Sequence, residues 1–144
     1  MIIDQGIDLK GVFNSSKYSL KMKSFEELGL SRNLLKILEE MNFEAPTEIQ
    51  EKVIPLAMAG KDVIGESATG SGKTLAFGAP VIEKVENGKG LQALILTPTR
   101  ELTEQVSKSL SEFSKYKSLR IVSIYGGVSL GPQIEGLRRA DIAV

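Results

Sequence analysis

The stretch GESATGSGKTL, residues 65–75, decides how the rest of the chain is interpreted. Two turn-forming glycines, Gly70 and Gly72, lead directly into Lys73 and Thr74. A short run at residues 61–64 ends in apolar side chains just before this stretch, and apolar positions at helical spacing follow it. The order predicts a strand, a loop and a helix, with the positive end of the helix dipole directed at the loop.

A loop of this composition is suited to bind phosphate. Glycines let the backbone fold tightly enough for several N–H groups to converge on one anion. Lys73 would then reach the outer phosphates of a nucleotide, and the hydroxyl of Thr74 would bind magnesium. The strict pattern has glycine where this chain has Ser67, so the match is imperfect. The alternative, a Gly/Ser-rich turn with a chance lysine, is disfavoured by the flanking strand and helix.

Composition restricts the chemistry that the chain can perform. Its 144 residues are 42% hydrophobic and 25% charged, which is ordinary for one globular domain. Cysteine and histidine are absent, which excludes disulfides, thiol nucleophiles, the usual zinc sites and histidine acid–base chemistry. The formal net charge is zero, so any nucleic-acid contact must be local. No apolar run reaches the roughly 18 residues of a membrane helix and no signal peptide is apparent, so we expect a cytoplasmic protein without membrane contact.

The chain before the phosphate loop divides into an extension and two helices. Residues 1–23 lack helical or strand periodicity and are interpreted as an N-terminal extension. Ser31 is expected to cap a first helix that stops near Asn42. Thr47 and Gln50 fit a capping box at the start of a second helix, in which each side chain bonds a backbone N–H of the other.

After the phosphate loop, apolar runs predict strands at residues 92–97, 119–125 and 142–144. The first of them, QALILT, is almost unbroken, which is typical of a strand buried on both faces of a parallel sheet. Strands that alternate with helices predict an α/β fold, a three-layer sandwich with a parallel sheet and right-handed crossovers.

Two helices are expected between these strands. Thr99 is expected to cap the first, whose inward face would consist of Leu102, Val106, Leu110, Phe113 and Tyr116. The second would lie around residues 132–139. Ligands of such sheets bind at the carboxyl ends of the strands. The phosphate loop, residues 98–102 and the pair Gly126-Gly127 are all predicted to lie there.

In their order and spacing these segments resemble the first RecA-like domain of a DEAD-box ATP-dependent RNA helicase, from about Phe25 to the end of the chain. The adenine-reading Q motif of that family is similar to residues 43–50, although Asn42 replaces the usual glycine. Its motif I resembles residues 67–74, where alanine is commoner than Ser67. Motif Ia matches residues 98–102 without change, and the family's double glycine matches residues 126 and 127.

The resemblance implies ATP and Mg2+ as cofactors and RNA as a partner. The implied nucleotide-binding residues are Phe25, Phe43, Thr47, Gln50, Ser67, Ala68, Thr69, Gly70, Ser71, Gly72, Lys73 and Thr74. Lys73 and Thr74 are the implied catalytic residues, with Thr74 as the metal ligand. RNA would be held at its phosphates, independently of base sequence, by Pro98, Thr99, Arg100, Gly126 and Gly127.

Several of these residues also have a purely structural interpretation. The amide of Gln50 offers a donor and an acceptor suited to adenine, yet the same groups complete the capping box. Phe43 either stacks on the base or fills an apolar gap after the first helix, and Phe25 is expected to support the site by packing. Thr99 and the double glycine would otherwise be a helix cap and a turn.

The resemblance also implies parts that are not found in residues 1–144. These are the acidic DEAD segment, the Ser-Ala-Thr element and the arginine fingers of a second RecA-like domain of the same chain. The full-length protein is thus expected to couple ATP hydrolysis to the unwinding or remodelling of RNA duplexes, whereas residues 1–144 alone should bind nucleotide weakly and not hydrolyse it. The alternatives are a non-catalytic nucleotide- or RNA-binding module and a related DNA helicase. The sequence does not indicate an oligomeric state.

Overall fold

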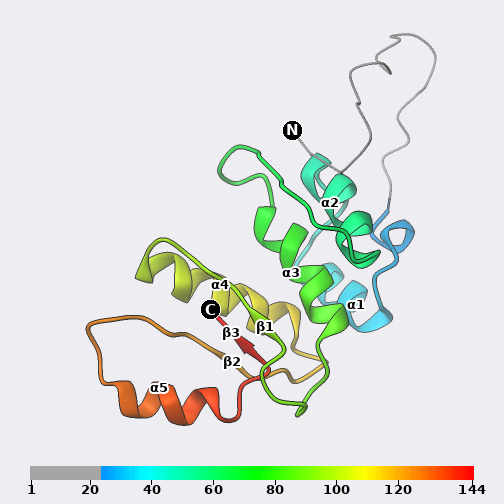
Figure 1. The fold of residues 1–144 in the computed structure, drawn as a ribbon. Coiled ribbons are helices and arrows are strands. Elements are labelled where there is room, and N and C mark those ends of the chain that lie inside the picture. Colours follow the sequence, from blue (N-terminus) through cyan, green and yellow to red (C-terminus); the bar gives the residue numbers. More distant parts are fainter. Residues whose placement is uncertain (1–23) are drawn as a thin grey trace, which may run out of the picture.

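The computed structural model describes residues 24–144, so the predicted extension at residues 1–23 lies outside the described part. The first elements are a 3-10 turn and three helices: η2 (Glu26–Leu28), α1 (Arg32–Glu40), α2 (Glu48–Met58) and α3 (Lys73–Lys84). Three short strands then alternate with two helices: β1 (Ala93–Leu94), α4 (Arg100–Phe113), β2 (Ile121–Val122), α5 (Leu130–Leu137) and β3 (Ile142–Ala143) (Figure 1). Over residues 24–144, no helix has the length and apolar character needed to cross a bilayer.

The helix ends follow local sequence signals. The hydroxyl of Ser31 accepts a hydrogen bond from the backbone N–H of Leu34 at 3.4 Å, which caps α1. The chain leaves this helix through Asn42 in the left-handed conformation, with φ 59°. Thr99 caps α4 by accepting from the N–H of Leu102 at 3.2 Å. These predicted caps and this predicted stop are therefore confirmed, because they depend on residues close together in the sequence.

The three strands form one parallel sheet in the order β1-β3-β2. The last strand of the chain is thus central, and α4 and α5 make the two crossovers. Backbone hydrogen bonds continue beyond the assigned strand residues, from the N–H of Gln92 to the carbonyl of Asp141 at 2.9 Å and from the N–H of Ile124 to that of Val144 at 2.8 Å. The three predicted strands at residues 92–97, 119–125 and 142–144 therefore exist, although each is shorter than expected.

Two helices cover opposite faces of this sheet. The hydroxyl of Ser123 donates to that of Ser107 on α4 at 2.8 Å. The neighbouring Val122 packs on α5, where a Cβ atom added to Gly136 would lie 2.9 Å from Val122 Cγ2. Consecutive residues of a strand point to opposite faces, so α4 and α5 lie on opposite sides of the sheet (Figure 1). The predicted three-layer α/β architecture is confirmed.

The prediction that residues 92–97 are buried on both faces is wrong. Leu94 and Leu96 are 68% and 85% exposed, whereas Ala93 and Ile95 between and beside them are half-buried against the core. Leu94 shares the register position of Ala143 and Val122, and therefore lies on the face that α5 covers. Within residues 24–144, α5 packs on β2 and leaves this side of β1 open.

The prediction of a strand at residues 61–64 is also wrong. This segment has no regular secondary structure and belongs to no sheet in the described part of the chain, and Ile64 is 67% exposed. Val63 packs against the small cluster formed by Ile49, Val53 and Ala76. A strand requires a neighbour that accepts its backbone hydrogen bonds, and the three described strands do not reach this segment.

The inward face predicted for α4 is correct at its centre and wrong at both ends. Val106, Leu110 and Phe113 are buried. Leu102 and Tyr116, however, are each 36% exposed. The buried positions nearer the start of the helix are polar, Thr103 and Ser107. The hydroxyl of Thr103 is hydrogen-bonded to that of Thr97 at 2.6 Å and donates to the backbone carbonyl of Thr99 at 3.1 Å, which offsets the cost of burying it. The next helix, α5 (Leu130–Leu137), begins and ends two residues earlier than the predicted helix at residues 132–139.

One hydrophobic core joins the helices to the sheet. Its largest fully buried side chains come from five elements: Leu34 and Leu38 from α1, Ile54 from α2, Leu75 from α3, Leu110 from α4 and Ile142 from β3. Burying side chains of this size contributes roughly 1.5–3 kcal/mol each. Helices α3 and α4 cross closely at Gly78, where an added Cβ would lie only 2.8 Å from Leu110 Cδ2. The core thus fixes α3, which carries the phosphate loop, relative to α4.

A buried carboxylate joins three segments at the amino ends of the strands. Asp141 is 0% exposed and accepts hydrogen bonds from the N–H of Gly88 and the N–H of Arg120, both at 2.8 Å. The guanidinium of Arg120 lies 3.6 Å away. Burial alone would raise the pKa of Asp141, but the two amide hydrogen bonds and the Arg120 charge together lower it. The carboxylate is therefore charged in the folded protein and ties the loop after α3 to β2 and β3.

Candidate functional site

The phosphate loop has the backbone that its glycines predict. Gly72 is the N-cap of α3 with φ 87°, and Gly70 has φ 80°. Both values lie in the left-handed region, where a side chain is disfavoured. Lys73 and Thr74 are the first residues of the helix that follows. Their side chains therefore project near the positive end of the α3 dipole, as required for binding an anion.

The loop is closed around its own lysine. The Lys73 ammonium donates to the carbonyl of Ser67 at 2.6 Å and to that of Ala68 at 2.7 Å. The N–H of Ser71 donates to the carbonyl of Ala68 at 3.3 Å. The hydroxyls of Ser67 and Ser71 are hydrogen-bonded to each other at 2.6 Å. In this conformation the loop presents carbonyl oxygens to Lys73, whereas Thr69 and Gly70 at its tip are exposed.

The start of α2 is bonded directly to this loop. The hydroxyl of Thr47 donates to the carbonyl of Ser71 at 2.8 Å, and the Gln50 amide donates to the carbonyl of Gly72 at 3.1 Å. The amide oxygen of Gln50 accepts from the N–H of Thr47 at 2.9 Å. The predicted capping box is present, and Gln50 is only 1% exposed. Since both ends of its amide are engaged within the protein, adenine reading by Gln50 stays a prediction.

Two aromatic residues named as site candidates pack against each other beside the start of α2. The rings of Phe25 and Phe43 meet edge to face with centroids 6.4 Å apart, and Phe43 meets Phe113 in the same way at 6.3 Å. Phe25 is 7% exposed, which agrees with a packing role, whereas Phe43 is half-buried. The structure thus shows the packing interpretation of both rings, and stacking of Phe43 on a base stays a prediction.

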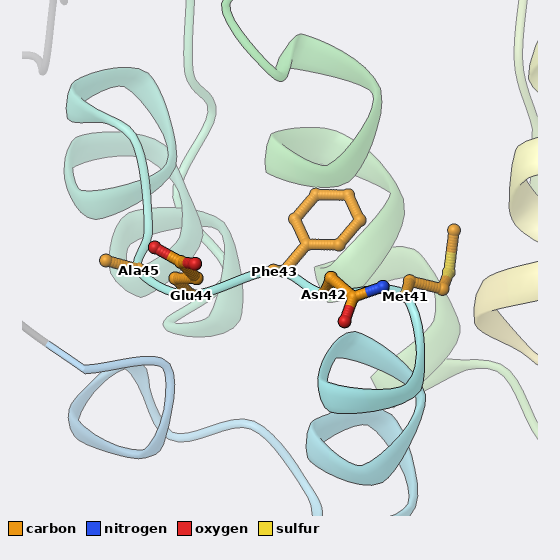
Figure 2. A pocket seen from close by; sticks show the side chains of 5 residues that line it. All are labelled: Met41, Asn42, Phe43, Glu44 and Ala45. Carbon is orange, nitrogen blue, oxygen red and sulfur yellow. The ribbon is translucent and has the colours of Figure 1, made fainter.

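Phe43 lines two hollows that leave space for a ligand near this cluster. One of about 570 Å³ lies between the residues around Phe25 and α1, and one of about 420 Å³ lies along residues 41–45. Figure 2 shows the second, in which the Phe43 ring points to the opposite side of the segment from Asn42. Volumes of this order accommodate small ligands in proteins, although these hollows are open.

The residues predicted to contact RNA come together from two distant segments. The guanidinium of Arg100, in the first turn of α4, donates to the carbonyl of Gly126 and lies 5.0 Å from the centroid of the Tyr125 ring. Gly127 has φ 83°, and an added Cβ would lie 2.5 Å from Arg100 Nη2. Pro98 and Thr99 precede the helix and are exposed. The N-terminus of α4 and the double glycine therefore form one exposed surface.

Sequence reasoning missed three residues that support this surface. The phenol of Tyr125 is hydrogen-bonded to Glu104, and this contact, with burial, raises the pKa of Tyr125 against the opposing charge of Arg100. The side chain of Gln133 accepts from the N–H of Tyr125 at 2.9 Å and donates to the carbonyl of Ser129 at 3.2 Å. Tyr125 directly precedes the double glycine, and this position is the local signal that points to it. Glu104 and Gln133 carry no local signal, because they are placed by tertiary structure.

Comparisons with known proteins agree with one family. The family model described as DEAD/DEAH box helicase matches residues 47–144. The chain is 48% identical over 119 residues to the DEAD-box ATP-dependent RNA helicase CshA of Geobacillus kaustophilus, a match that covers 82% of this chain and 26% of the relative. The chain therefore spans about a quarter of the length of that relative.

Solved structures show the same likeness. A DEAD box protein from the hyperthermophile Methanococcus jannaschii matches with a TM-score of 0.78 and 44% identity, covering 84% of this chain and 34% of that one. The RNA helicase Prp28 from Chaetomium thermophilum, solved bound to ADP, matches with a TM-score of 0.75 and 42% identity, covering 85% of this chain and 32% of that one. The described fold is thus that of a RecA-like domain in proteins of this kind.

Proposed function

Because the chain belongs to the DEAD/DEAH box helicase family, we propose that it is the ATP-binding part of an ATP-dependent RNA helicase. The full-length protein would couple ATP hydrolysis to the unwinding or remodelling of RNA duplexes. A second RecA-like domain of the same chain and a cytoplasmic location are parts of this proposal.

The observation that carries the proposal is the position of Lys73. Its ammonium lies over the phosphate loop at the start of α3, where it bonds the carbonyls of Ser67 and Ala68. A polyphosphate would offer it oxygens of full negative charge in place of two neutral carbonyls, and charge-assisted hydrogen bonds are the stronger ones. The loop amides and the α3 dipole favour an anion in the same place.

The residues around Lys73 also fit a magnesium nucleotide. Thr74 follows it in the first turn of α3 and supplies a hydroxyl, a hard oxygen ligand that Mg2+ accepts. When bound, Mg2+ would neutralise charge that develops on the phosphates. Thr47 and Gln50, which bond the loop carbonyls, would set the position of the loop relative to the base.

The RNA-binding part of the proposal depends on the surface formed by α4 and the double glycine. Thr99 and Arg100 place a helix N-terminus and a guanidinium at one exposed position, and Gly126 and Gly127 allow close approach of another backbone. Such groups contact phosphates rather than base edges, so we expect binding that does not depend on sequence.

The test is ATP hydrolysis by the full-length gene product with and without single-stranded RNA. We expect RNA to stimulate hydrolysis, and Lys73→Ala to reduce it at least about a hundredfold, because transition-state charge loses its main cation. Lys89→Ala, in an exposed turn, is the matched control and should leave the rate unchanged. A protein that binds ATP and RNA without hydrolysis would be the non-catalytic module. Stimulation by DNA alone would instead favour a DNA helicase.

A further inference from the structure

The hydroxyls of Ser67 and Ser71 form a bond that the proposed function does not use. Their oxygens are 2.6 Å apart, and the contact is partly buried. The two residues stand at opposite ends of the loop at residues 67–71. The bond therefore holds the two ends of the phosphate loop together.

The loop that this bond closes is not ready for an anion. The N–H of Ser71 is engaged by the carbonyl of Ala68, and Lys73 is engaged by the carbonyls of Ser67 and Ala68. An anion requires amide N–H groups and the ammonium as free donors, and it is repelled by inward carbonyl oxygens. Binding of phosphate must therefore first separate Ser71 from Ala68 and release Lys73.

The hydrogen bond between the Ser67 and Ser71 hydroxyls opposes that rearrangement, because it holds together the two ends of the loop that must separate. Ser71 is also held from outside, because its carbonyl accepts from the hydroxyl of Thr47 at 2.8 Å. The loop therefore opens by movement of the Ser67 and Ala68 side, against which the Ser67 hydroxyl pulls. Gly70, with φ 80° and no heavy atom within 4 Å of an added Cβ, offers a free pivot between them.

We propose that the Ser67 hydroxyl acts as a latch that keeps the phosphate loop closed and lowers nucleotide affinity. The inference rests on the proposed function, since it assigns a regulator to the same ATP site. A protein whose competent state is a minor fraction binds with an affinity reduced by that fraction. Removing one hydrogen bond from the closed state should thus tighten binding by about three- to tenfold.

A direct contact from Ser67 to phosphate would have the opposite sign. If the hydroxyl donated to a bound phosphate, Ser67→Ala would weaken binding by a similar factor. The direction of the change therefore separates a latch from a ligand. A latch also requires both hydroxyls, so the effect of Ser67→Ala should depend on the presence of Ser71, whereas the effect of a direct phosphate contact should not.

The experiment measures binding of a fluorescent ADP analogue, and of unlabelled ATP by competition, to the full-length gene product without RNA. We compare the wild-type protein with Ser67→Ala, Ser71→Ala, the double variant and Lys73→Ala, and use Ser109→Ala on α4 as control. We expect Ser67→Ala to tighten nucleotide binding in the wild-type background and to have no effect in the Ser71→Ala background. Weaker or unchanged binding by Ser67→Ala, or equal tightening in both backgrounds, would overturn it.

A second measurement, amide hydrogen exchange, separates opening of the loop from a loss of folding in a variant. Amide hydrogen exchange across residues 67–72 without nucleotide should be faster in Ser67→Ala, while α3 and α4 keep their protection. Unchanged exchange at the loop refutes the latch. If no variant binds nucleotide and Lys73→Ala has no effect, the proposed function itself fails, and the latch with it; if only Ser67→Ala fails, the ATP site stands.

Discussion

Replacing Gly72 with alanine tests how closely the start of α2 packs on the phosphate loop. Two costs combine at this position. The residue has φ 87°, where an alanine costs about 1–2 kcal/mol in the left-handed region. The added Cβ would also lie 2.3 Å from Gln50 Nε2, closer than atoms can approach.

The second cost follows from the burial of Gln50. This side chain is 1% exposed, so it can only escape by leaving its bond to the Gly72 carbonyl. A buried polar group without its partner costs about 1–3 kcal/mol. Gly72→Ala should therefore destabilise the protein by about 2–5 kcal/mol in total.

Gly70→Ala is a control that isolates the contact with Gln50. Its φ of 80° carries the same backbone cost, but no heavy atom lies within 4 Å of its added Cβ. The unfolding midpoint of the domain, followed by circular dichroism, should fall further for Gly72→Ala than for Gly70→Ala. At about 4 °C per kcal/mol, the difference should be roughly 4–12 °C. Equal midpoints would refute the argument that Gln50 is wedged against the loop.

Three further predictions follow from single contacts. Gln50→Glu keeps the acceptor for the N–H of Thr47 but loses the donor to Gly72, so urea unfolding should show a loss of about 1–3 kcal/mol; no loss would contradict the geometry. Asp141→Asn should cost about 1–3 kcal/mol at pH 7. Because the pKa of Asp141 is lowered in the folded protein, its stabilisation is present above the ordinary value of 3.8 and is lost as pH falls through the folded pKa. The stability advantage of the wild-type protein over Asp141→Asn should therefore vanish below the folded pKa. An advantage that persisted at acid pH would be inconsistent with a charged Asp141. Arg100→Ala should weaken RNA binding about tenfold and reduce the slope of log affinity against log salt concentration by about one, because one phosphate contact is lost. Arg138→Ala, at the exposed end of α5, should change neither quantity. Equal effects of the two substitutions would remove the RNA role of Arg100.

Much of the site could be predicted because its determinants are local. The glycines of the phosphate loop, the Ser31 and Thr99 caps and the Thr47–Gln50 capping box each depend on residues within a few positions of one another. Backbone conformation and capping are decided at that range. The family likeness added the grouping of these segments into one site, which short-range signals alone do not provide.

The structure added what depends on distant partners. It shows that both ends of the Gln50 amide are hydrogen-bonded within the protein, one of them to the carbonyl of Gly72. It also shows that the Lys73 ammonium donates to a loop carbonyl and that Arg100 donates to the carbonyl of Gly126. The pairs Gln50–Gly72 and Arg100–Gly126 are not visible in the sequence, because the packing of distant segments sets the distance between their groups.

The sequence by itself determined the helices and the three strands of the described sheet, their order and the turns that glycine makes possible, because these follow from the spacing of apolar side chains and from local backbone preference. Only the tertiary structure decided which apolar faces are covered. Leu94 and Leu96 have the composition of a buried strand, yet α5 packs on β2 and leaves them exposed. The residues at 61–64 likewise form no strand beside the described sheet. Whether a segment is buried or paired depends on the second segment that packs against it, and the residues of the first segment alone do not specify that partner.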